Sequence, residues 1–183
     1  TLLHTCCAPC SIYCVDSLRQ EGIQPTSYWF NPNIHPYTEY RSRKTTLEEY
    51  AKSIQLPLII DNTYGLRSFV RAVIDDLEHR CFYCYQVRLA QTARYAAEHH
   101  FDSFSTTLLV SPYQKHDALI AAGEAAARQY NVPFLYRDFR VGFQQGQEQA
   151  KTLDLYRQKY CGCIFSEEER YRWKQIQKEK EQR

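Results

Sequence analysis

Eight cysteines fall into three tight groups along the 183 residues of the chain. The groups are Cys6-Cys7-Ala8-Pro9-Cys10 with Cys14 one helical turn on, Cys81-Phe82-Tyr83-Cys84, and Cys161-Gly162-Cys163. Cysteines that only fill a core are spread along a sequence, whereas clusters indicate sulfurs that converge on a soft metal or a redox reaction. The first two groups are typical of metal ligands, and the third is typical of a dithiol or disulfide pair.

The spacing within the first two groups bears on which metal they bind. Cys81 and Cys84 have the two-residue gap that lets both thiolates reach one metal centre, but zinc sites, iron–sulfur sites and redox dithiols all share that gap. Cys6 and Cys7 are adjacent, and adjacent side chains of an extended segment point to opposite faces. Two such sulfurs are more easily placed on different atoms of a polynuclear cluster than on one ion, which favours iron–sulfur over zinc.

Two cysteines of the first group have a plain alternative, which is to be small buried hydrophobic residues. That alternative is favoured for Cys14, on the inward face of a predicted helix. For Cys10 both interpretations stay open.

The third group, Cys161 and Cys163, is too close-set to suit a single metal. A disulfide between them closes a very small ring, and a strained disulfide has the oxidising potential that is typical of labile, catalytic pairs. Gly162 supplies the backbone freedom that such a turn needs. We predict a functional exchange pair, and the alternative is two free surface thiols.

The elements that position these groups follow from short apolar runs that alternate with helical periods. The predicted strands are 2–4, 27–30, 57–61, 102–107 and 134–137, and the predicted helices are 11–21, 47–54, 85–96, 114–130, about 147–159 and about 167–180. This alternation predicts an α/β fold, a doubly wound and mostly parallel sheet of about five strands with helices closing the C-terminal end. No repeat or linker interrupts it, so residues 1–183 are predicted to form a single domain.

Loops after the strands of such a sheet gather at one crevice, where ligands bind. Cys6, Cys7 and Cys10 follow the first predicted strand, where a phosphate-binding loop needs glycine. The chain has no glycine before Gly22, so the sequence predicts a metal there rather than ATP. His35, in the loop after the second strand, is a candidate proton donor or substrate contact, or else polar surface.

The composition and the first residues of the chain indicate the class of protein and its compartment. Hydrophobic residues make up 44% and charged residues 24%, as in globular proteins, and no apolar run is long enough for a membrane span. The opening Thr1-Leu2-Leu3-His4 has no basic segment of a signal peptide. The sequence therefore predicts a cytoplasmic protein with no membrane partner, and in that reducing compartment clustered cysteines bind metal or catalyse. The net charge of +2 permits a nucleic-acid partner without arguing for one.

Ordered motifs along nearly the whole chain resemble the QueH family of epoxyqueuosine reductases. They are Leu3-His4-Thr5-Cys6-Cys7-Ala8-Pro9-Cys10-Ser11, Phe30-Asn31-Pro32-Asn33-Ile34-His35-Pro36 with Glu39-Tyr40, Arg80-Cys81-Phe82-Tyr83-Cys84, Phe104-Ser105-Thr106-Thr107-Leu108-Leu109, Ser111-Pro112-Tyr113-Gln114, Leu155-Tyr156-Arg157-Gln158 and Tyr160-Cys161-Gly162-Cys163. Several motifs in order are much more specific than one C-x-x-C.

The resemblance implies the last step of queuosine synthesis, in which the epoxide of epoxyqueuosine in tRNA is reduced to a cyclopentene. It implies a fold similar to the HUP-like adenine-nucleotide α-hydrolase group, without the nucleotide loop. It also implies a [4Fe–4S] cluster with an additional iron ion beside it, for which Cys10 is the candidate ligand. The implied cluster ligands are Cys6, Cys7, Cys81 and Cys84, and the implied redox-active disulfide joins Cys161 and Cys163.

The implied tRNA substrate needs a surface that holds a splayed base. Tyr37 and Tyr40 lie beside the basic residues Arg41 and Lys44, so we predict substrate contacts there, against the alternative of a solvated helix face. The sequence does not identify the electron donor. Two other functions remain open: a thiol–disulfide reductase that works through Cys161 and Cys163, and a zinc-stabilised RNA-binding module without catalysis.

Overall fold

Four parallel strands form one sheet in the computed structural model, which describes residues 1–181 and the side chains of all of these except 174 and 177–181. The strand order is β3-β2-β1-β4, with β1 (Leu2–His4), β2 (Thr26–Trp29), β3 (Leu58–Ile60) and β4 (Phe104–Thr106). Leu3 pairs with Ser27 on one side and with Ser105 on the other. The predicted parallel α/β sheet is therefore confirmed.

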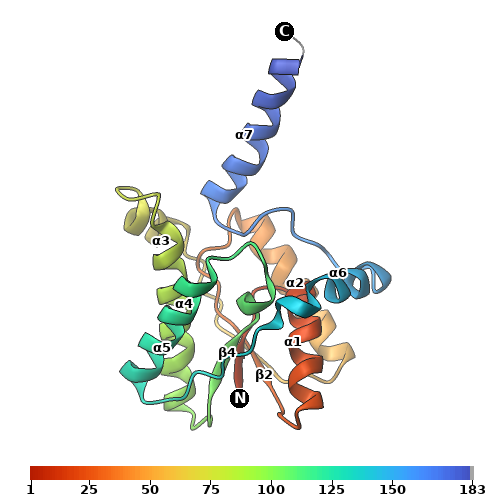
Figure 1. Cartoon of the computed structure of the whole chain (residues 1–183), viewed down its shortest axis with the longest axis vertical. Helices are drawn as coiled ribbons and strands as arrows, with labels where there is room; N and C mark the ends of the chain where they lie inside the picture. The colour runs from red at the N-terminus through yellow and green to blue at the C-terminus, as the bar shows by residue number, and fades with distance from the viewer. Residues whose placement is uncertain (182–183) are drawn as a thin grey trace.

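Helices cover both faces of the sheet (Figure 1). Their bounds are α1 (Ala8–Gln20), α2 (Tyr37–Ser53), α3 (Leu66–Val73), α4 (Arg80–Glu98), α5 (His116–Tyr130), α6 (Phe143–Thr152) and α7 (Ile164–Glu181), with 3₁₀ turns η1 (Thr107–Val110) and η2 (Phe139–Gly142). In Figure 1, α4 and α5 lie on one side of the strands and α1 and α6 on the other, while α7 extends away from the rest. Within residues 1–181, no helix combines the length and the apolar character that crossing a membrane requires.

The alternation of side chains along β2 shows how each face is closed. The ring of Tyr28 stacks on Tyr95 of α4, with 4.8 Å between centroids. The next residue, Trp29, points to the opposite face, where its indole N–H donates to the hydroxyl of Tyr40 on α2 at 3.1 Å. Consecutive residues of a strand face opposite sides, so a pair of aromatic residues anchors a helix on each face.

The predicted fifth strand is wrong in extent. Only Phe134 of that segment pairs with the sheet, by a single parallel bridge to Phe104. The Leu135 N–H donates to the Phe104 carbonyl at 2.7 Å, but the next amide, of Tyr136, bonds back to the Phe134 carbonyl at 3.1 Å. That local turn ends the pairing after one residue, so the described part of the sheet has four strands rather than five.

Three helix predictions also need correction, and one helix was missed. The predicted helix 47–54 begins ten residues earlier, at Tyr37, and ends at Ser53. The first helix begins at Ala8 rather than at residue 11, so its first turn includes Cys10. The predicted helix 147–159 begins at Phe143 and ends at Thr152, because Asp154 takes a left-handed backbone conformation with φ of 51°. The helix α3 was not predicted at all.

Gly65, the residue before α3, lies against the loop that follows β2. A Cβ atom at this position would come within 2.5 Å of the Pro32 Cβ and 2.6 Å of the Pro32 carbonyl oxygen. Real Cβ contacts are not this short, so any larger residue must displace backbone. By contrast, a Cβ at Gly146 in α6 would meet nothing closer than the Pro9 carbonyl oxygen at 3.5 Å.

We therefore expect Gly65→Ala to lower the free energy of unfolding by about 1–3 kcal/mol, the usual cost of forced overpacking. The matched control Gly146→Ala should leave that free energy unchanged or raise it by up to about 1 kcal/mol, because alanine favours a helix interior. Denaturant unfolding of both variants measures the difference. Equal stability of the two variants would show that the Gly65–Pro32 contact is not constraining.

Candidate functional site

The first cysteine group lies where the strand order reverses. The chain continues from β1 to β2 on one side, whereas β4 pairs on the other, and ligands of open α/β sheets bind at such a point. Cys6 follows β1 and Thr107 follows β4. The Cys6 N–H donates to the Thr107 hydroxyl oxygen at 3.2 Å, and that hydroxyl lies 3.5 Å from the Cys6 sulfur. The group therefore lies in the crevice where the sequence predicted it.

The sulfurs of Cys6, Cys7 and Cys10 form a compact triad. All three lie within 4.8 Å of one another, and those of Cys6 and Cys7 are 3.8 Å apart. The prediction that adjacent cysteines point to opposite faces is wrong here, because Cys7 is the residue that caps α1 and the chain turns into the helix. Sulfurs on one tetrahedral metal at about 2.3 Å are about 3.8 Å apart. The triad thus fits a single soft cation as well as part of a cluster.

Protonation is unequal among these three thiols. The pKa of the Cys6 thiol lies well below its usual value, because the Cys10 and Cys7 thiols hydrogen-bond to its sulfur. The same hydrogen bond to Cys6 raises the pKa of Cys10, and burial raises the pKa of Cys7. Cys6 is therefore the first of the three sulfurs to become a thiolate, the form that binds metal.

The second group, Cys81 and Cys84, occupies the first turn of α4. Cys84 is buried, and burial raises the pKa of its thiol to about 12. One turn further along, Arg88 places its Nη1 3.6 Å from the Cys84 sulfur. The positive charge of Arg88 also acts on Cys6 across the crevice. This guanidinium therefore links the first two cysteine groups electrostatically.

Arg88 is 2% exposed and has neutral partners for its remaining donors. Its Nε lies 3.2 Å from the His4 Nε2, and its Nη2 donates to the Asn31 side-chain oxygen at 2.7 Å. Within the described residues, no aspartate or glutamate forms an ion pair with it. An uncompensated buried charge costs several kcal/mol, and the negative groups that act most strongly on Arg88 are the sulfurs of Cys84 and Cys6.

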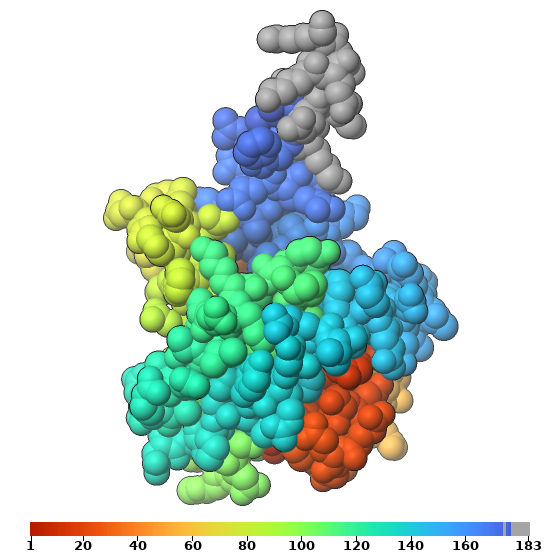
Figure 2. Space-filling view, in the orientation of Figure 1, coloured from red at the N-terminus to blue at the C-terminus, as the bar shows by residue number. Residues whose placement is uncertain are grey.

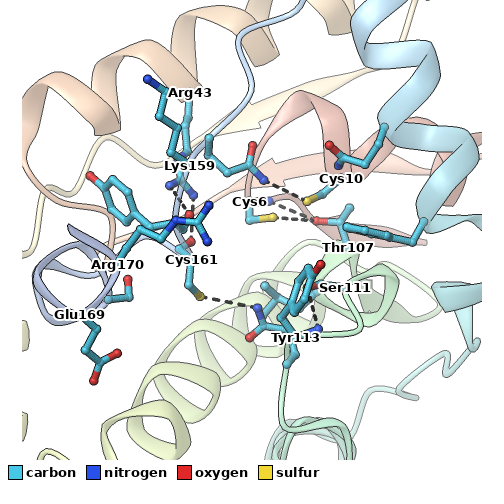
Figure 3. A pocket seen from close by; sticks show the side chains of 17 residues that line it. Cys6, Cys10, Arg43, Thr107, Ser111, Tyr113, Lys159, Cys161, Glu169 and Arg170 are labelled. Atoms are coloured by element: carbon cyan, nitrogen blue, oxygen red, sulfur yellow. Dashed lines mark hydrogen bonds between the residues drawn. The ribbon is translucent and has the colours of Figure 1, made fainter. Parts of the chain in front are cut away.

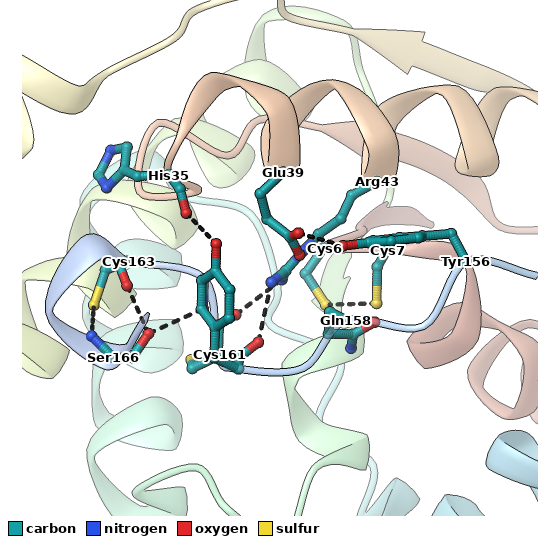
Figure 4. A network of polar contacts seen from close by, with 12 residues as sticks. Cys6, Cys7, His35, Glu39, Arg43, Tyr156, Gln158, Cys161, Cys163 and Ser166 are labelled. Atoms are coloured by element: carbon teal, nitrogen blue, oxygen red, sulfur yellow. Dashed lines mark hydrogen bonds and ion pairs between the residues drawn. The ribbon is translucent and has the colours of Figure 1, made fainter. Parts of the chain in front are cut away.

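A connecting segment, residues 153–163, crosses the site between α6 and α7, and we refer to it as the strap. Arg43 of α2 fastens the strap (Figure 4): its Nη2 donates to the Tyr160 carbonyl at 3.0 Å and its Nη1 to the Cys161 carbonyl at 2.9 Å. Its Nε donates to Glu39 at 2.7 Å. The other carboxylate oxygen of Glu39 accepts a hydrogen bond from the Tyr156 hydroxyl. One buried ion pair thus holds the strap at two places, Tyr156 and residues 160–161.

The third cysteine group lies at the end of the strap. Cys161 is exposed and its sulfur lies 3.5 Å from the Gln114 side-chain nitrogen, whereas Cys163 is buried and packs in one cluster with Cys84. Both are free thiols in this structure, so their pairing stays a prediction. Gly162 between them has a φ of 151°, a conformation that side chains rarely adopt, in agreement with the predicted need for glycine.

His35 is a structural residue rather than surface. It is fully buried, its Nε2 donates to the Pro32 carbonyl at 3.0 Å, and its Nδ1 accepts the Ile164 N–H at 3.3 Å. These two bonds require the neutral ring with its proton on Nε2. Burial lowers the pKa of His35 to about 4, which keeps the ring neutral at physiological pH. His35 therefore attaches the start of α7 to the loop after β2.

A cavity of about 560 Å³ opens above the first cysteine group (Figure 3). Its lining comes from the residues after β1 and β4, from α1, α2 and α6, from the loop before α5, from the strap and from the start of α7. The lining residues are Cys6, Cys10, Arg43, Thr107, Leu108, Ser111, Tyr113, Gln114, Phe143, Gln147, Gln158, Lys159, Tyr160, Cys161, Ser166, Glu169 and Arg170. Sulfurs of the first and third groups thus face one space. Its volume is typical of small-ligand sites.

The predicted substrate contacts on α2 are not among the cavity-lining residues. Tyr40 is 3% exposed and packs on Trp29, so it cannot stack on a base there. Tyr37 and Arg41 are exposed, and Lys44 donates to the side-chain oxygen of Asn62 at 2.6 Å. For these three, RNA contact stays a prediction.

Cys14 and Cys10 lie in different surroundings, one in the core and one at the cavity, which the sequence had left open for Cys10. Cys14 is fully buried, donates to the Cys10 carbonyl at 3.3 Å and belongs to the main hydrophobic core. Cys10 instead faces the cavity, where the Gln158 side-chain nitrogen lies 3.5 Å from its sulfur.

Sequence reasoning missed the two buried arginines. Arg88 stands four residues after Cys84, on the same helix face, and that spacing could have identified it. Arg43 gave no such signal, since the strap that it binds is more than a hundred residues away in the chain.

Comparison with known proteins agrees with these motifs. A family model described as epoxyqueuosine reductase QueH matches residues 1–169. A protein named epoxyqueuosine reductase QueH from Dehalococcoides mccartyi is 39% identical over 170 residues, which cover 93% of this chain and 93% of that protein. A protein of the same name from Haemophilus influenzae is 34% identical over 183 residues, covering 95% of this chain and 74% of the relative.

Among solved structures, one similar chain is described as a predicted subunit of tRNA methyltransferase from Methanocaldococcus jannaschii. It has a TM-score of 0.55 and 15% sequence identity, and the match covers 82% of this chain and 74% of that one. At that identity the likeness concerns the fold alone.

His35 makes stability depend on pH. Its folded-state pKa of about 4 lies below the ordinary value of 6.5, so the neutral ring stabilises the fold above pH 6.5, and this contribution is lost as the pH falls toward 4. Between pH 7 and 4.5 we expect the wild type to lose about 2 kcal/mol more unfolding free energy than His35→Gln, which cannot titrate. His99→Gln, which removes an exposed histidine, should follow the wild type. Parallel pH profiles for the wild type and His35→Gln in denaturant unfolding would contradict this assignment.

Proposed function

The chain belongs to the epoxyqueuosine reductase QueH family, and we propose that it reduces epoxyqueuosine in tRNA with a [4Fe–4S] cluster held by Cys6, Cys7, Cys81 and Cys84. Reduction of epoxyqueuosine is the activity of this family, and it belongs to queuosine biosynthesis. The cluster type, its ligands and the role of the remaining cysteines are the finer parts of the proposal. We assign the activity to residues 1–183 as one domain, because the proposed site draws on sulfurs from near both ends of the chain.

The charge of Arg88 is the observation that carries the cluster assignment. This buried guanidinium lies by Cys84 and acts on Cys6, with no acidic side chain among the described residues to balance it. A zinc ion on the Cys6, Cys7 and Cys10 triad leaves Cys84 and Arg88 unexplained. A cluster held by four thiolates carries net negative charge and spans both groups, so it supplies what Arg88 lacks.

Cys10 is the proposed ligand of an additional iron ion. Its sulfur belongs to the triad and also faces the cavity, so it can hold a cation at the cavity side. This is a soft donor of the kind that iron and zinc accept. The zinc-stabilised module remains the second candidate, because the triad spacing also suits a single zinc ion.

Removal of an epoxide oxygen as water consumes two electrons and two protons. When bound, the cluster would supply single-electron transfer, and the additional iron ion at Cys10 would supply a Lewis acid. The strap, fastened by Arg43, forms one side of the cavity in which the substrate would be held. Oxidation of the Cys161 and Cys163 thiols to a disulfide releases two electrons and two protons, the number that the reaction consumes, so we propose that this pair is redox-active.

The remaining partners follow from this chemistry. A reductant must return Cys161 and Cys163 to thiols after each turnover, and its identity is open. Cysteines that hold a metal and a pair that must return to thiols need a reducing compartment, which supports the cytoplasm as the location.

The cluster assignment predicts the effect of removing one ligand. Anaerobically purified wild type should be brown with about four irons or more per chain, and Cys81→Ala should lose the colour, most of the iron and the reduction of epoxyqueuosine-containing tRNA. Cys14→Ala, a change of a buried core cysteine, should keep all three. Iron and zinc analysis with absorbance spectra measures this. An iron-free wild type with stoichiometric zinc would instead support the zinc-stabilised module.

Removing the charge of Arg88 should weaken the hold on the cluster. We expect Arg88→Met to bind iron about 10–100-fold less tightly, the usual effect of losing a hydrogen bond to a metal ligand, whereas Arg88→Lys keeps the charge and more of the iron. Iron retention during a chelator titration measures the affinity, and thermal melting checks that each variant is folded. A folded Arg88→Met protein that retains iron as well as the wild type would overturn the charge argument.

A further inference from the structure

The mouth of the cavity carries an exposed aromatic ring. Tyr113, in the loop between η1 and α5, is 83% exposed, the highest value of any large hydrophobic side chain in the described part of the chain. Single exposed aromatic residues are common. This one differs by its place, because it lines the same cavity as Cys6 and Cys10.

The loop that carries Tyr113 is held in position. The Tyr113 N–H donates to the Ser111 hydroxyl at 3.3 Å, and its ring meets Phe143 edge to face at 5.8 Å between centroids. Figure 2 shows the segments around these two residues, green and cyan, adjoining on the surface. Because Tyr113 is 83% exposed, most of its ring remains open to a flat partner.

The side of the cavity formed by the strap and α7 carries positive charge. Lys159 and Arg170 are exposed and line it, and within the described residues neither forms an ion pair. The one acidic lining residue, Glu169, is already paired with Arg80 at 2.6 Å. In Figure 3, Lys159 and Arg170 lie toward one side of the cavity and Cys10 toward the other, with Tyr113 at its edge. Such a rim attracts phosphate groups.

One residue of the cavity lining, Gln158, has an unused hydrogen-bond acceptor. The side-chain oxygen of Gln158 is buried and has no hydrogen-bond partner, while the nitrogen of the same amide lies 3.5 Å from the Cys10 sulfur. A buried polar atom without a partner is costly, so this oxygen is suited to accept a hydrogen bond from a hydroxyl or amine of a bound molecule.

We propose that this cavity is the binding site for one nucleoside extruded from a single-stranded RNA loop, with its base stacked on Tyr113 and its flanking phosphates against Lys159 and Arg170. The proposal rests on the proposed function and names the residues that recognise its substrate. Stacking on an aromatic ring with basic residues beside it is how proteins hold unpaired nucleotides, and the volume of about 560 Å³ suits one nucleoside rather than a duplex. Substrate recognition thus lies on the loop before α5 and on the strap, rather than on α2.

Binding of a fluorescently labelled stem-loop RNA, cut from the tRNA substrate around its modified nucleoside, to anaerobically prepared holoprotein tests the stacking contact. Tyr113→Ala should weaken binding about tenfold, whereas Tyr113→Phe, which keeps the ring, should stay within about twofold of the wild type. Tyr136→Ala, a change of an exposed tyrosine outside the cavity lining, is the matched control and should bind like the wild type.

Salt dependence tests the basic rim. Lys159→Gln and Arg170→Gln should each weaken binding and reduce the slope of log affinity against log salt by about 0.7, as expected for one lost phosphate contact to a single strand. The double variant Arg41→Glu, Lys44→Glu should keep the wild-type slope. If Tyr113→Ala binds as tightly as the wild type, or if the loss appears only in the α2 double variant, the proposal is wrong.

Failure of this inference is distinct from failure of the proposed function. A wild type that reduces epoxyqueuosine in tRNA, together with a Tyr113→Ala variant of unchanged KM and RNA affinity, overturns only the nucleoside site. A wild type that binds the RNA through Tyr113 without reducing epoxyqueuosine overturns the proposed reaction and leaves the site standing.

Discussion

The buried positive charge of Arg88 is the constraint on which the arrangement of this site depends. A guanidinium that is 2% exposed is stable only if its charge is balanced and its donors are satisfied. His4 and Asn31 satisfy two donors without adding negative charge, which leaves the sulfurs around it to supply the balance. Sulfurs from α4 and from the end of β1 therefore act on one buried charge. Burial alone would keep such thiols protonated, as it does for Cys84.

The parallel sheet brings the residues around Arg88 to one edge, where the cavity opens. Because β1 and β4 end side by side, Cys6 and Thr107 meet at the point where the strand order reverses. The helices α1 and α4 begin at the same edge, so their first turns contribute Cys10 and Cys81 to the site. The strap then crosses above, and His35 fixes where α7 begins. Each contribution is short in sequence, and the topology brings them together.

Local patterns predicted the parts of this structure that local forces decide. The alternation of apolar runs and helical periods predicted a parallel α/β sheet, and the loop position of Cys6 and Cys7 placed them at its crevice. The prediction of a fifth strand was wrong because the Tyr136 amide forms its hydrogen bond within its own segment. The pattern of apolar residues does not indicate such a local bond. The cysteine-pair argument failed for a similar reason, since the start of α1 at Ala8 changes where the Cys7 side chain points.

Contacts between distant segments were beyond the reach of the sequence. Arg43 and the strap meet only in the folded chain, and so do Tyr113 and Phe143. The basic and aromatic run around Tyr40 was conspicuous in the sequence, yet Tyr40 turned out to be needed for the core beside Trp29. A motif shows that a residue type is suited to a chemistry, whereas burial decides whether the residue is free to perform it.

The way in which Arg43 holds the strap has a consequence for how this site can vary. Both of its hydrogen bonds to the strap go to main-chain carbonyls, those of Tyr160 and Cys161. The attachment therefore does not depend on which side chains stand at these positions. Exchange of the Cys161 sulfur for another group changes the chemistry without detaching the backbone that presents it. Loop placement and thiol reactivity are thus separable properties, and evolution or an engineer can alter the second while the first is kept.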